Sequence, residues 1–188
     1  GIVQLPDSGF VLVGTGTGGP GSMIVRTDAA GEMIFSREYQ PNQFAQFTDC
    51  VLSEDENIVV TTYGTGTMLD SENGDVIWSN NYFVEGSGEV WQVANSNEGG
   101  YLLTGRISSI GAGSSDIYAV KIDADGEELW RTILLDDEDN ILIKTLYALT
   151  ETPDGGFACI NYVRDNVRLI RIDVDGTLIW FTQYYVRR

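Results

Sequence analysis

Short apolar runs alternate along the chain with turns rich in glycine and acidic residues, and this pattern occurs four times. In each unit, a run of four mainly apolar residues follows a turn that resembles Asp-Gly-Gly. These runs are Phe10–Val13, Ile58–Thr61, Tyr101–Thr104 and Phe157–Ile160. Such runs between turn residues are typical of buried strands. Because the apolar residues are nearly continuous, we expect both faces of these strands to be buried.

A second phrase follows in each unit: a turn of the type Asp-x-x-Gly, with one extra residue in the second unit, then a strand that ends on an aromatic residue. The aromatic residues are Phe35, Trp78, Trp130 and Trp180, which are 43, 52 and 50 residues apart. This period matches the blade of a propeller and exceeds most solenoid coils. One further strand before the first turn and one before the second complete a unit of four strands.

We therefore predict an all-β fold, a β-propeller made of four-stranded antiparallel blades. The chain holds four blades, at about residues 1-40, 44-83, 88-134 and 144-188, in a single domain or part of one. No helix is expected. Propellers contain about 4 to 8 blades. We expect these four to be part of a larger ring, completed by additional blades or by a second copy as a homodimer, with closure by four blades as the alternative.

The charge narrows the range of partners. The chain has 28 acidic and 11 basic residues, a formal net charge of −17, and no histidine. An acidic surface repels phosphate backbones and anionic lipids, so we expect no nucleic-acid partner. No apolar run approaches the about 20 residues that cross a bilayer, so no membrane insertion is expected. Without histidine, the commonest general base and the commonest zinc ligand are missing.

The Asp-Gly-Gly-Phe turn at Asp154, together with the phrase Asp123-Ala-Asp-Gly126-Glu-Glu-Leu-Trp130, resembles propeller repeats of secreted and cell-surface proteins of bacteria and archaea. It is also similar to the tryptophan-docking repeats of quinoprotein alcohol dehydrogenases and of the outer-membrane assembly scaffold lipoprotein. The resemblance covers essentially the whole chain and implies a secreted or cell-surface location. It also implies that Phe35, Trp78, Trp130 and Trp180 pack against the adjacent blade. Phe35 departs from the tryptophan of that motif.

Two turns carry paired carboxylates that suit calcium, Asp123 with Asp125 and Asp173 with Asp175. The rest of a calcium loop does not follow them. The alternative is that each aspartate caps its turn while glycine takes the left-handed position. The acidic run Asp136–Asp139 is expected to be a solvated loop.

Cys50 and Cys159 are expected to be free, buried thiols rather than a disulfide. Aligning the units places Cys50 with Ile2, Val93 and Leu149, and places Cys159 with Leu12, Val60 and Leu103. Both cysteines therefore replace apolar core residues in different blades. The glycine-rich segment Gly14–Gly21 resembles a phosphate loop, but no helix and no Lys-Ser/Thr pair follow it.

The functional prediction is a non-catalytic binding or scaffolding module of a secreted or cell-surface protein, with a protein or glycan partner. Its expected binding surface includes Phe44, Phe47, Trp91 and Tyr147, and no cofactor is predicted. The alternative is a propeller enzyme, a quinone-dependent dehydrogenase or a glycan-active hydrolase, whose site is completed by further blades. The residues at the expected axis offer no acid and base pair, which favours the binding module.

Overall fold

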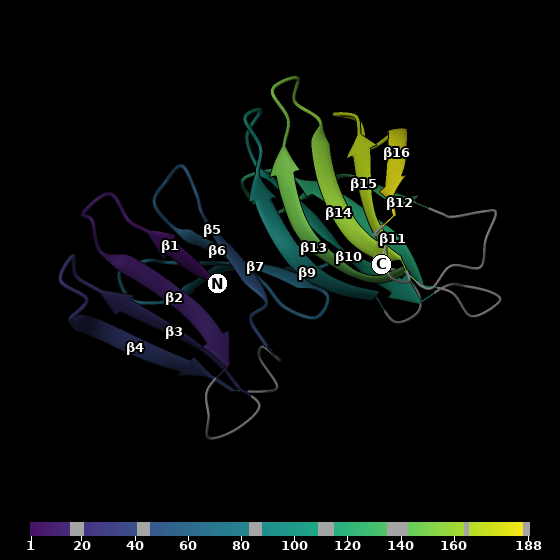
Figure 1. Cartoon of the computed structure of the whole chain (residues 1–188). Coiled ribbons are helices and arrows are strands. Elements are labelled where there is room, and N and C mark those ends of the chain that lie inside the picture. Colours follow the sequence, from purple (N-terminus) through teal and green to yellow (C-terminus); the bar gives the residue numbers. More distant parts are fainter. Residues whose placement is uncertain are drawn as a thin grey trace. The chain divides into compact units, whose positions relative to one another are not determined.

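The computed structural model describes residues 1–15, 21–40, 46–82, 88–108, 115–134, 143–163 and 166–185. These residues form four antiparallel sheets of four strands each and contain no helix. Within each sheet the strands lie side by side in chain order (Figure 1). Among the described residues there is accordingly no helix that could cross a membrane. The prediction of an all-β fold with four four-stranded blades is confirmed.

The contacts divide the chain into two compact units, Gly1–Tyr82 and Phe83–Arg188, each with two blades. The strands of the first unit are β1 (Ile2–Gln4), β2 (Phe10–Thr15), β3 (Ser22–Thr27), β4 (Met33–Tyr39), β5 (Asp49–Leu52), β6 (Ile58–Thr61), β7 (Thr65–Leu69) and β8 (Val76–Asn81). The first four strands form blade 1 and the next four form blade 2.

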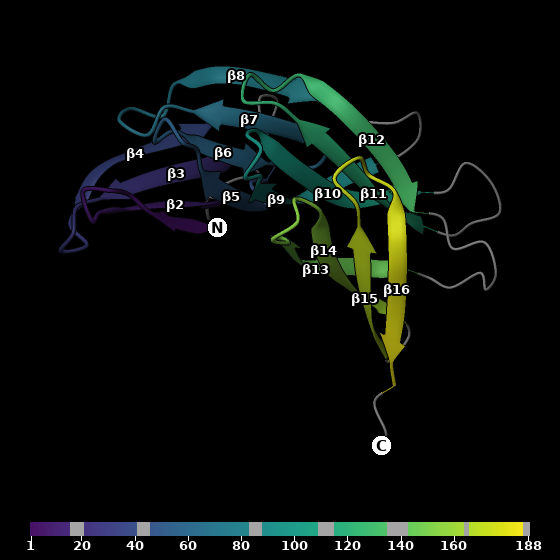
Figure 2. The ribbon, with the colours of Figure 1, turned by 90° about the horizontal axis from the view of Figure 1, so that it is seen from above.

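The second unit contains blades 3 and 4. Its strands are β9 (Gly88–Asn95), β10 (Tyr101–Ser108), β11 (Ser115–Ile122), β12 (Glu128–Leu134), β13 (Ile143–Glu151), β14 (Phe157–Val163), β15 (Asn166–Ile172) and β16 (Leu178–Tyr184). In blade 4, β16 runs beside β15 at the edge of the sheet (Figure 2).

Two recurring turns account for the repeat. An Asp-x-x-Gly turn, lengthened by one residue in blade 2, precedes the outermost strand of each blade. Its glycine has a positive φ in all four copies, for example 84° at Gly31 and 85° at Gly176. Glycine adopts this backbone conformation at little cost because it has no Cβ. In the turn between the first two strands, Ser8 and Glu56 adopt the positive φ that Gly99 and Gly155 have in blades 3 and 4.

Each unit has a core that its two blades share. In the first unit, Val11, Ile24, Cys50 and Val60 belong to one buried cluster, to which Phe35 also packs. In the second unit, residues of blade 3 pack with residues of blade 4. The members are Leu102, Ala119, Phe157, Cys159, Ile170 and Ile172, with Trp130 and Leu149 packed against them. Burial of strands on both faces therefore comes from stacking one blade on the next.

Candidate functional site

The innermost strands of blades 3 and 4 each contain a β-bulge at an aromatic residue. In blade 3 the pairing of β9 with β10 passes from Gln92 to Val90 and skips Trp91. In blade 4 the pairing of β13 with β14 passes from Leu146 to Ala148 and skips Tyr147. Bulges redirect side chains and are frequent beside functional sites. Trp91 and Tyr147, both expected in a binding surface from the sequence, therefore occupy the same special backbone position in neighbouring blades.

The bulge brings Trp91 and Gln92 to one face of blade 3. Gln92 lies opposite Thr104 in the strand pairing, so their side chains share a face. Arg106 is two residues beyond Thr104 and projects to that same face. The guanidinium carbon of Arg106 lies 5.3 Å from the centroid of the Trp91 ring. Consecutive residues of a regular strand point in opposite directions, so the bulge explains how Trp91 joins this group.

This face of blade 3 is the one that blade 4 covers. Leu102, two residues before Thr104 on the same strand, belongs to the core shared with blade 4. The innermost strands β9 and β13 contact each other, and so do β10 and β13. The site therefore lies within the second unit, between the inner strands of its two blades.

Three polar atoms of this group are buried without a hydrogen-bond partner among the described residues. They are the indole Nε1 of Trp91, the amide Oε1 of Gln92 and the hydroxyl Oγ1 of Thr104. The whole Thr104 residue is 1% exposed. A buried polar atom without a partner costs about 1–3 kcal/mol, so most such atoms in folded proteins are satisfied. One donor, one acceptor and one hydroxyl on a single face match a ligand that carries both donors and acceptors.

The equivalent position in blade 2 is satisfied internally. Thr61 occupies the repeat position of Thr104, and its Oγ1 lies 2.9 Å from Oγ1 of Thr48, the residue aligned with Trp91. Thr48 also donates to the carbonyl oxygen of Thr61 at 3.1 Å. Replacing the short threonine by the bulged tryptophan removes this pairing in blade 3.

The other expected binding residues differ in placement. Phe47 is a core residue, which corrects its assignment to a binding surface. It is 5% exposed and packs edge-on against Tyr39 at 5.4 Å between ring centroids. Its backbone N–H donates to Oγ of Ser22 at 2.9 Å. Phe44, like the acidic run Asp136–Asp139 and part of the glycine-rich segment, lies outside the described residues.

Trp130 makes a specific contact with the next blade. Its Nε1–H donates to the carbonyl oxygen of Val174, in the Asp-x-x-Gly turn of blade 4, at 2.9 Å. A Cβ placed on Gly176 would lie 2.7 Å from Cε3 of the indole, so only glycine permits this approach. Phe35 packs on the core shared by blades 1 and 2, Trp78 is half-buried, and Trp180 is 44% exposed.

In the first unit, Tyr39 makes the contact with the glycine of the following turn. Its hydroxyl donates to the carbonyl oxygen of Gly74 at 2.6 Å. Burial raises the pKa of Tyr39 to about 12. A Cβ on Gly74 would lie 3.0 Å from that hydroxyl oxygen. Tyr39 was not predicted from the sequence; the available signal was a second aromatic residue four positions after Phe35, repeated at Tyr184 after Trp180.

A basic side chain that contacts the first turn of the blade in three units was also not predicted from the sequence. Arg26, Lys121 and Arg171 occupy one repeat position, two residues before the aspartate of the second turn. Lys121 donates to the carbonyl oxygen of Gly99 at 2.8 Å, and Arg171 pairs with Asp154 at 2.5 Å. This repeat position holds a basic residue in three of the four units, as an alignment of the units shows. Met68 replaces the cation in blade 2.

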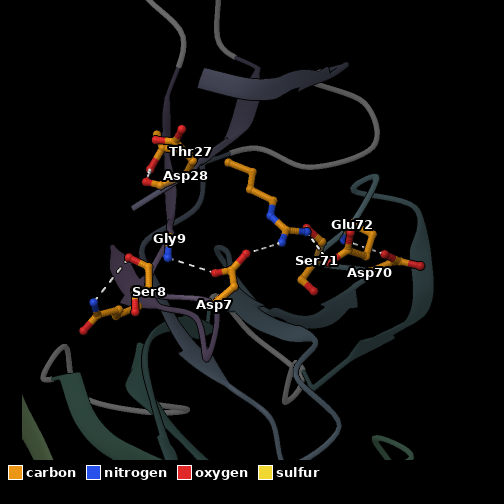
Figure 3. Close-up of polar contacts among 10 residues, drawn as sticks. Asp7, Ser8, Gly9, Thr27, Asp28, Asp70, Ser71 and Glu72 are labelled. Carbon is orange, nitrogen blue, oxygen red and sulfur yellow. Dashed lines mark hydrogen bonds and ion pairs between the residues drawn. The ribbon is translucent and has the colours of Figure 1, made fainter. Parts of the chain in front are cut away.

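Arg26 also links the two blades of the first unit. It pairs with Asp7 at 2.8 Å, donates to the carbonyl oxygen of Ser71 at 3.2 Å and pairs with Glu72. Figure 3 shows Asp7 in blade 1 facing Ser71 and Glu72 in the turn of blade 2. The pKa of Asp7 is lowered, most strongly by the hydrogen bond from the N–H of Gly9 and next by the hydrogen bond from Arg26. Ser71 occupies the turn position of Val174. Arg26 therefore donates to the turn carbonyl in the first unit, whereas the Trp130 indole donates to the equivalent carbonyl in the second unit.

The turns proposed for calcium use their carboxylates internally. Asp123 Oδ1 accepts the N–H groups of Asp125 and Glu127 at 3.0 and 2.8 Å. Asp175 Oδ1 accepts the N–H of Thr177 at 3.1 Å, and hydrogen bonds from Thr177 lower the pKa of Asp175. Asp28, which has no second acid in its turn, makes the same contacts with Ala30 and Glu32. Calcium binding at Asp123, Asp125, Asp173 and Asp175 stays a prediction.

Both thiols are free and buried. Burial raises the pKa of Cys50 to about 11 and that of Cys159 to about 12. In every blade, the residue at the repeat position of Cys50 on the first strand pairs with the residue at the repeat position of Cys159 on the second strand. The pairs are Ile2 with Leu12, Cys50 with Val60, Val93 with Leu103 and Leu149 with Cys159.

Comparisons with known proteins agree on the fold. No protein-family model matches the chain, and no curated protein matches it. The solved structure of quinohemoprotein alcohol dehydrogenase ADHIIG from Pseudomonas putida HK5 matches 94% of the chain with a TM-score of 0.65 at 15% identity, over 32% of its own length. BamB from Moraxella catarrhalis matches 95% of the chain with a TM-score of 0.59 at 16% identity, over 50% of its length.

The quinohemoprotein alcohol dehydrogenase from Comamonas testosteroni also matches, with a TM-score of 0.64 at 15% identity, over 97% of the chain and 35% of its own length. The chain thus spans about a third of each dehydrogenase and half of BamB. Its four sheets therefore have the fold of propeller blades, the architecture that the repeat predicted.

Proposed function

We propose that the chain is a non-catalytic binding or scaffolding module of a secreted or cell-surface protein, and that it binds a protein segment between blades 3 and 4. The observation that carries this proposal is the group of buried atoms on Trp91, Gln92 and Thr104 that have no hydrogen-bond partner within the part of the chain that the structure describes. A peptide amide offers a carbonyl oxygen to the indole N–H and an N–H to the Gln92 oxygen. Retaining these atoms costs stability, which is common where a site must bind a ligand.

The charge of Arg106 and its position near the Trp91 ring also fit a peptide ligand. The Arg106 guanidinium near the Trp91 ring supplies positive charge beside the donor, in a chain whose net charge is −17. The expected ligand is therefore neutral overall and rich in hydrogen-bonding groups. A neutral oligosaccharide shares these features and is the alternative ligand class.

The test follows the indole N–H signal of Trp91 by NMR. Trp91→Phe assigns that signal because it removes the indole N–H and keeps an aromatic ring. The probes are a blocked hexapeptide of alternating serine and valine and a linear glucose hexasaccharide. We expect a saturable shift of the Trp91 signal with the peptide and no saturable shift of Trp130. A shift with the hexasaccharide alone would assign glycan binding, and the absence of any saturable shift would contradict the proposed site.

A propeller enzyme is the second candidate, and the fold likeness to two quinohemoprotein alcohol dehydrogenases supports it. Its site would be completed by further blades. A measurement of enzymatic activity distinguishes the binding module from the enzyme. Alcohol oxidation in the presence of an added quinone cofactor would favour the enzyme, and its absence would favour the module.

A further inference from the structure

The turn before the outermost strand of blade 2 differs in sequence from the corresponding turns of the other blades. It reads Asp70-Ser-Glu-Asn-Gly74, and the residue directly before its glycine is an asparagine. No other asparagine in the chain precedes a glycine. Asn73 is exposed, and Gly74 has a φ of 75°. Because glycine has no Cβ, nothing on residue 74 shields its backbone nitrogen from the side chain of Asn73.

The side chain of Asn73 is folded back along the backbone that follows it. Its Oδ1 accepts the N–H of Asp75 at 2.6 Å, so the side-chain amide lies beside the Gly74 peptide. A hydrogen bond to Oδ1 draws electron density from Cγ and stabilises the negative charge that develops on this oxygen when Cγ is attacked. An activated carbonyl carbon held beside a nitrogen atom is the arrangement that an intramolecular reaction needs.

The same turn receives hydrogen bonds from the outermost strand of blade 1. Tyr39 donates to the carbonyl oxygen of Gly74 at 2.6 Å, and Arg37 donates to the carbonyl oxygen of Asn73 at 3.3 Å. Arg37 also pairs with Asp75 at 2.5 Å. Two successive carbonyl groups of the turn therefore hold blade 1 to blade 2, within the first unit.

We propose that Asn73 is a modification site, at which the chain converts this asparagine to isoaspartate and thereby weakens the contact between blades 1 and 2. The Gly74 nitrogen loses its proton to water or hydroxide and attacks Cγ of Asn73. The new N–C bond closes a succinimide ring, and ammonia leaves with Nδ2. Water then opens the ring: hydrolysis at Cγ gives aspartate, and hydrolysis at the backbone carbonyl carbon gives isoaspartate.

This conversion needs water and no oxidant, reductant or cofactor. The Gly74 N–H donates to the carbonyl oxygen of Asp70 at 2.8 Å, and this bond must open before the nitrogen can attack. The reaction is therefore slow, and its extent records the age of the protein. The proposal is independent of the binding site between blades 3 and 4.

The two products disturb the turn to different degrees. Isoaspartate adds a methylene group to the backbone between the two carbonyl groups that blade 1 contacts. Tyr39 is 3% exposed, so its hydroxyl loses a partner in a place that water does not readily reach. Aspartate keeps the backbone but replaces the Nδ2 group, which donates to Oδ2 of Asp70 at 3.4 Å, by an oxygen. Isoaspartate should therefore weaken the contact more than aspartate does.

The first test measures the modification itself by mass spectrometry of peptides from the folded chain after storage at mildly alkaline pH. We expect the peptide that contains Asn73 to gain the mass of an amide-to-acid conversion and to separate into two products. An isoaspartate methyltransferase should label one of them. Asn97 is the internal control, because it is also exposed but precedes Glu98, whose side chain hinders the attack. Asn73→Gln, which keeps an amide on a longer side chain, should stay unmodified.

The comparison with the chain unfolded in urea decides whether the fold permits the reaction. An Asn73 that stays an amide in the folded chain, while the unfolded chain is modified completely, would overturn the modification site. Equal modification of Asn73 and Asn97 in the folded chain would overturn it as well, because it would show no selectivity for the glycine turn.

The second test measures the effect on the contact between the blades. The modified chain carries one more negative charge, so ion exchange separates it from the unmodified chain. We expect its denaturation midpoint at a lower urea concentration, with a smaller decrease for Asn73→Asp. Tyr39→Phe lacks the hydroxyl, so modification should lower its midpoint by less. An unchanged midpoint, or equal decreases with and without the Tyr39 hydroxyl, would overturn the proposed effect on the contact.

Discussion

The indole of Trp130 lies against Gly176 of the next blade, and its Nε1–H donates to the carbonyl oxygen of Val174 at 2.9 Å. The contact needs a glycine for two reasons: the positive φ of 85° and the space that a Cβ would occupy. Tyr39 and Gly74 form the corresponding contact in the first unit. Within each unit, the two blades are thus joined by an aromatic residue on one strand and a turn carbonyl on the next blade.

Gly176→Ala should cost stability through two effects, the positive φ of the backbone and the collision of the new Cβ with the Trp130 indole. The positive φ alone costs an alanine about 1–2 kcal/mol of unfolding free energy. Displacing the Trp130 ring and its hydrogen bond adds about 1–2 kcal/mol. Gly99→Ala is the control, since Gly99 has a φ of 86° and nothing lies within 4 Å of its Cβ position. Chemical denaturation should give a clearly larger loss for Gly176→Ala; equal losses would show that the indole contact contributes nothing.

The repeat carried most of the fold information in the sequence. Turn glycines and apolar runs predicted the strands, and the alignment of units predicted that Cys50 and Cys159 are free, buried thiols, as they are in the structure. The bulge at Trp91 depends on how two strands pair, and residue types alone do not specify it. Phe47 was misplaced because an aromatic residue before a strand can face solvent or core, and its contact with Tyr39 decides this.

The buried thiols predict a loss of stability in alkali. An unfolded cysteine ionises near its ordinary pKa of 9.0, whereas burial raises the pKa of Cys159 to about 12. Its contribution is therefore present below pH 9 and is lost as the pH rises from 9 toward 12, by roughly 1 kcal/mol per pH unit. Cys159→Val should be nearly neutral at pH 7, because valine or leucine fills this position in blades 2 and 3.

Unfolding free energies measured at pH 7, 9 and 10 test this prediction. The variant should lose less stability between pH 9 and 10 than the unaltered chain does. Cys50→Val is the companion variant, because burial raises the pKa of Cys50 to about 11. Identical slopes for Cys159→Val and the unaltered chain would mean that the Cys159 thiol ionises normally in the folded state.

The aspartate turns should hold without calcium. Asp123 Oδ1 already accepts two backbone N–H groups, a role that an asparagine oxygen can fill. We expect Asp123→Asn to leave the thermal midpoint nearly unchanged, and Asp123→Ala to cost about 1 kcal/mol. Melting curves with EDTA and with added calcium check this. A midpoint that rises with calcium in the unaltered chain but not in Asp123→Asn would instead assign a calcium site to this turn.

The Thr104 hydroxyl, for which the described residues offer no hydrogen-bond partner, gives the most direct test of the proposed binding site. Thr104→Val keeps the shape of the side chain and removes the buried oxygen, so it should raise the unfolding free energy by about 1–2 kcal/mol. Thr61→Val is the matched control, because the Thr61 hydroxyl lies 2.9 Å from Oγ1 of Thr48, and its loss should lower the unfolding free energy by about 1 kcal/mol. Chemical denaturation of the free protein gives both values. Stabilisation by Thr104→Val alone is the predicted result, and destabilisation of both variants would contradict the account.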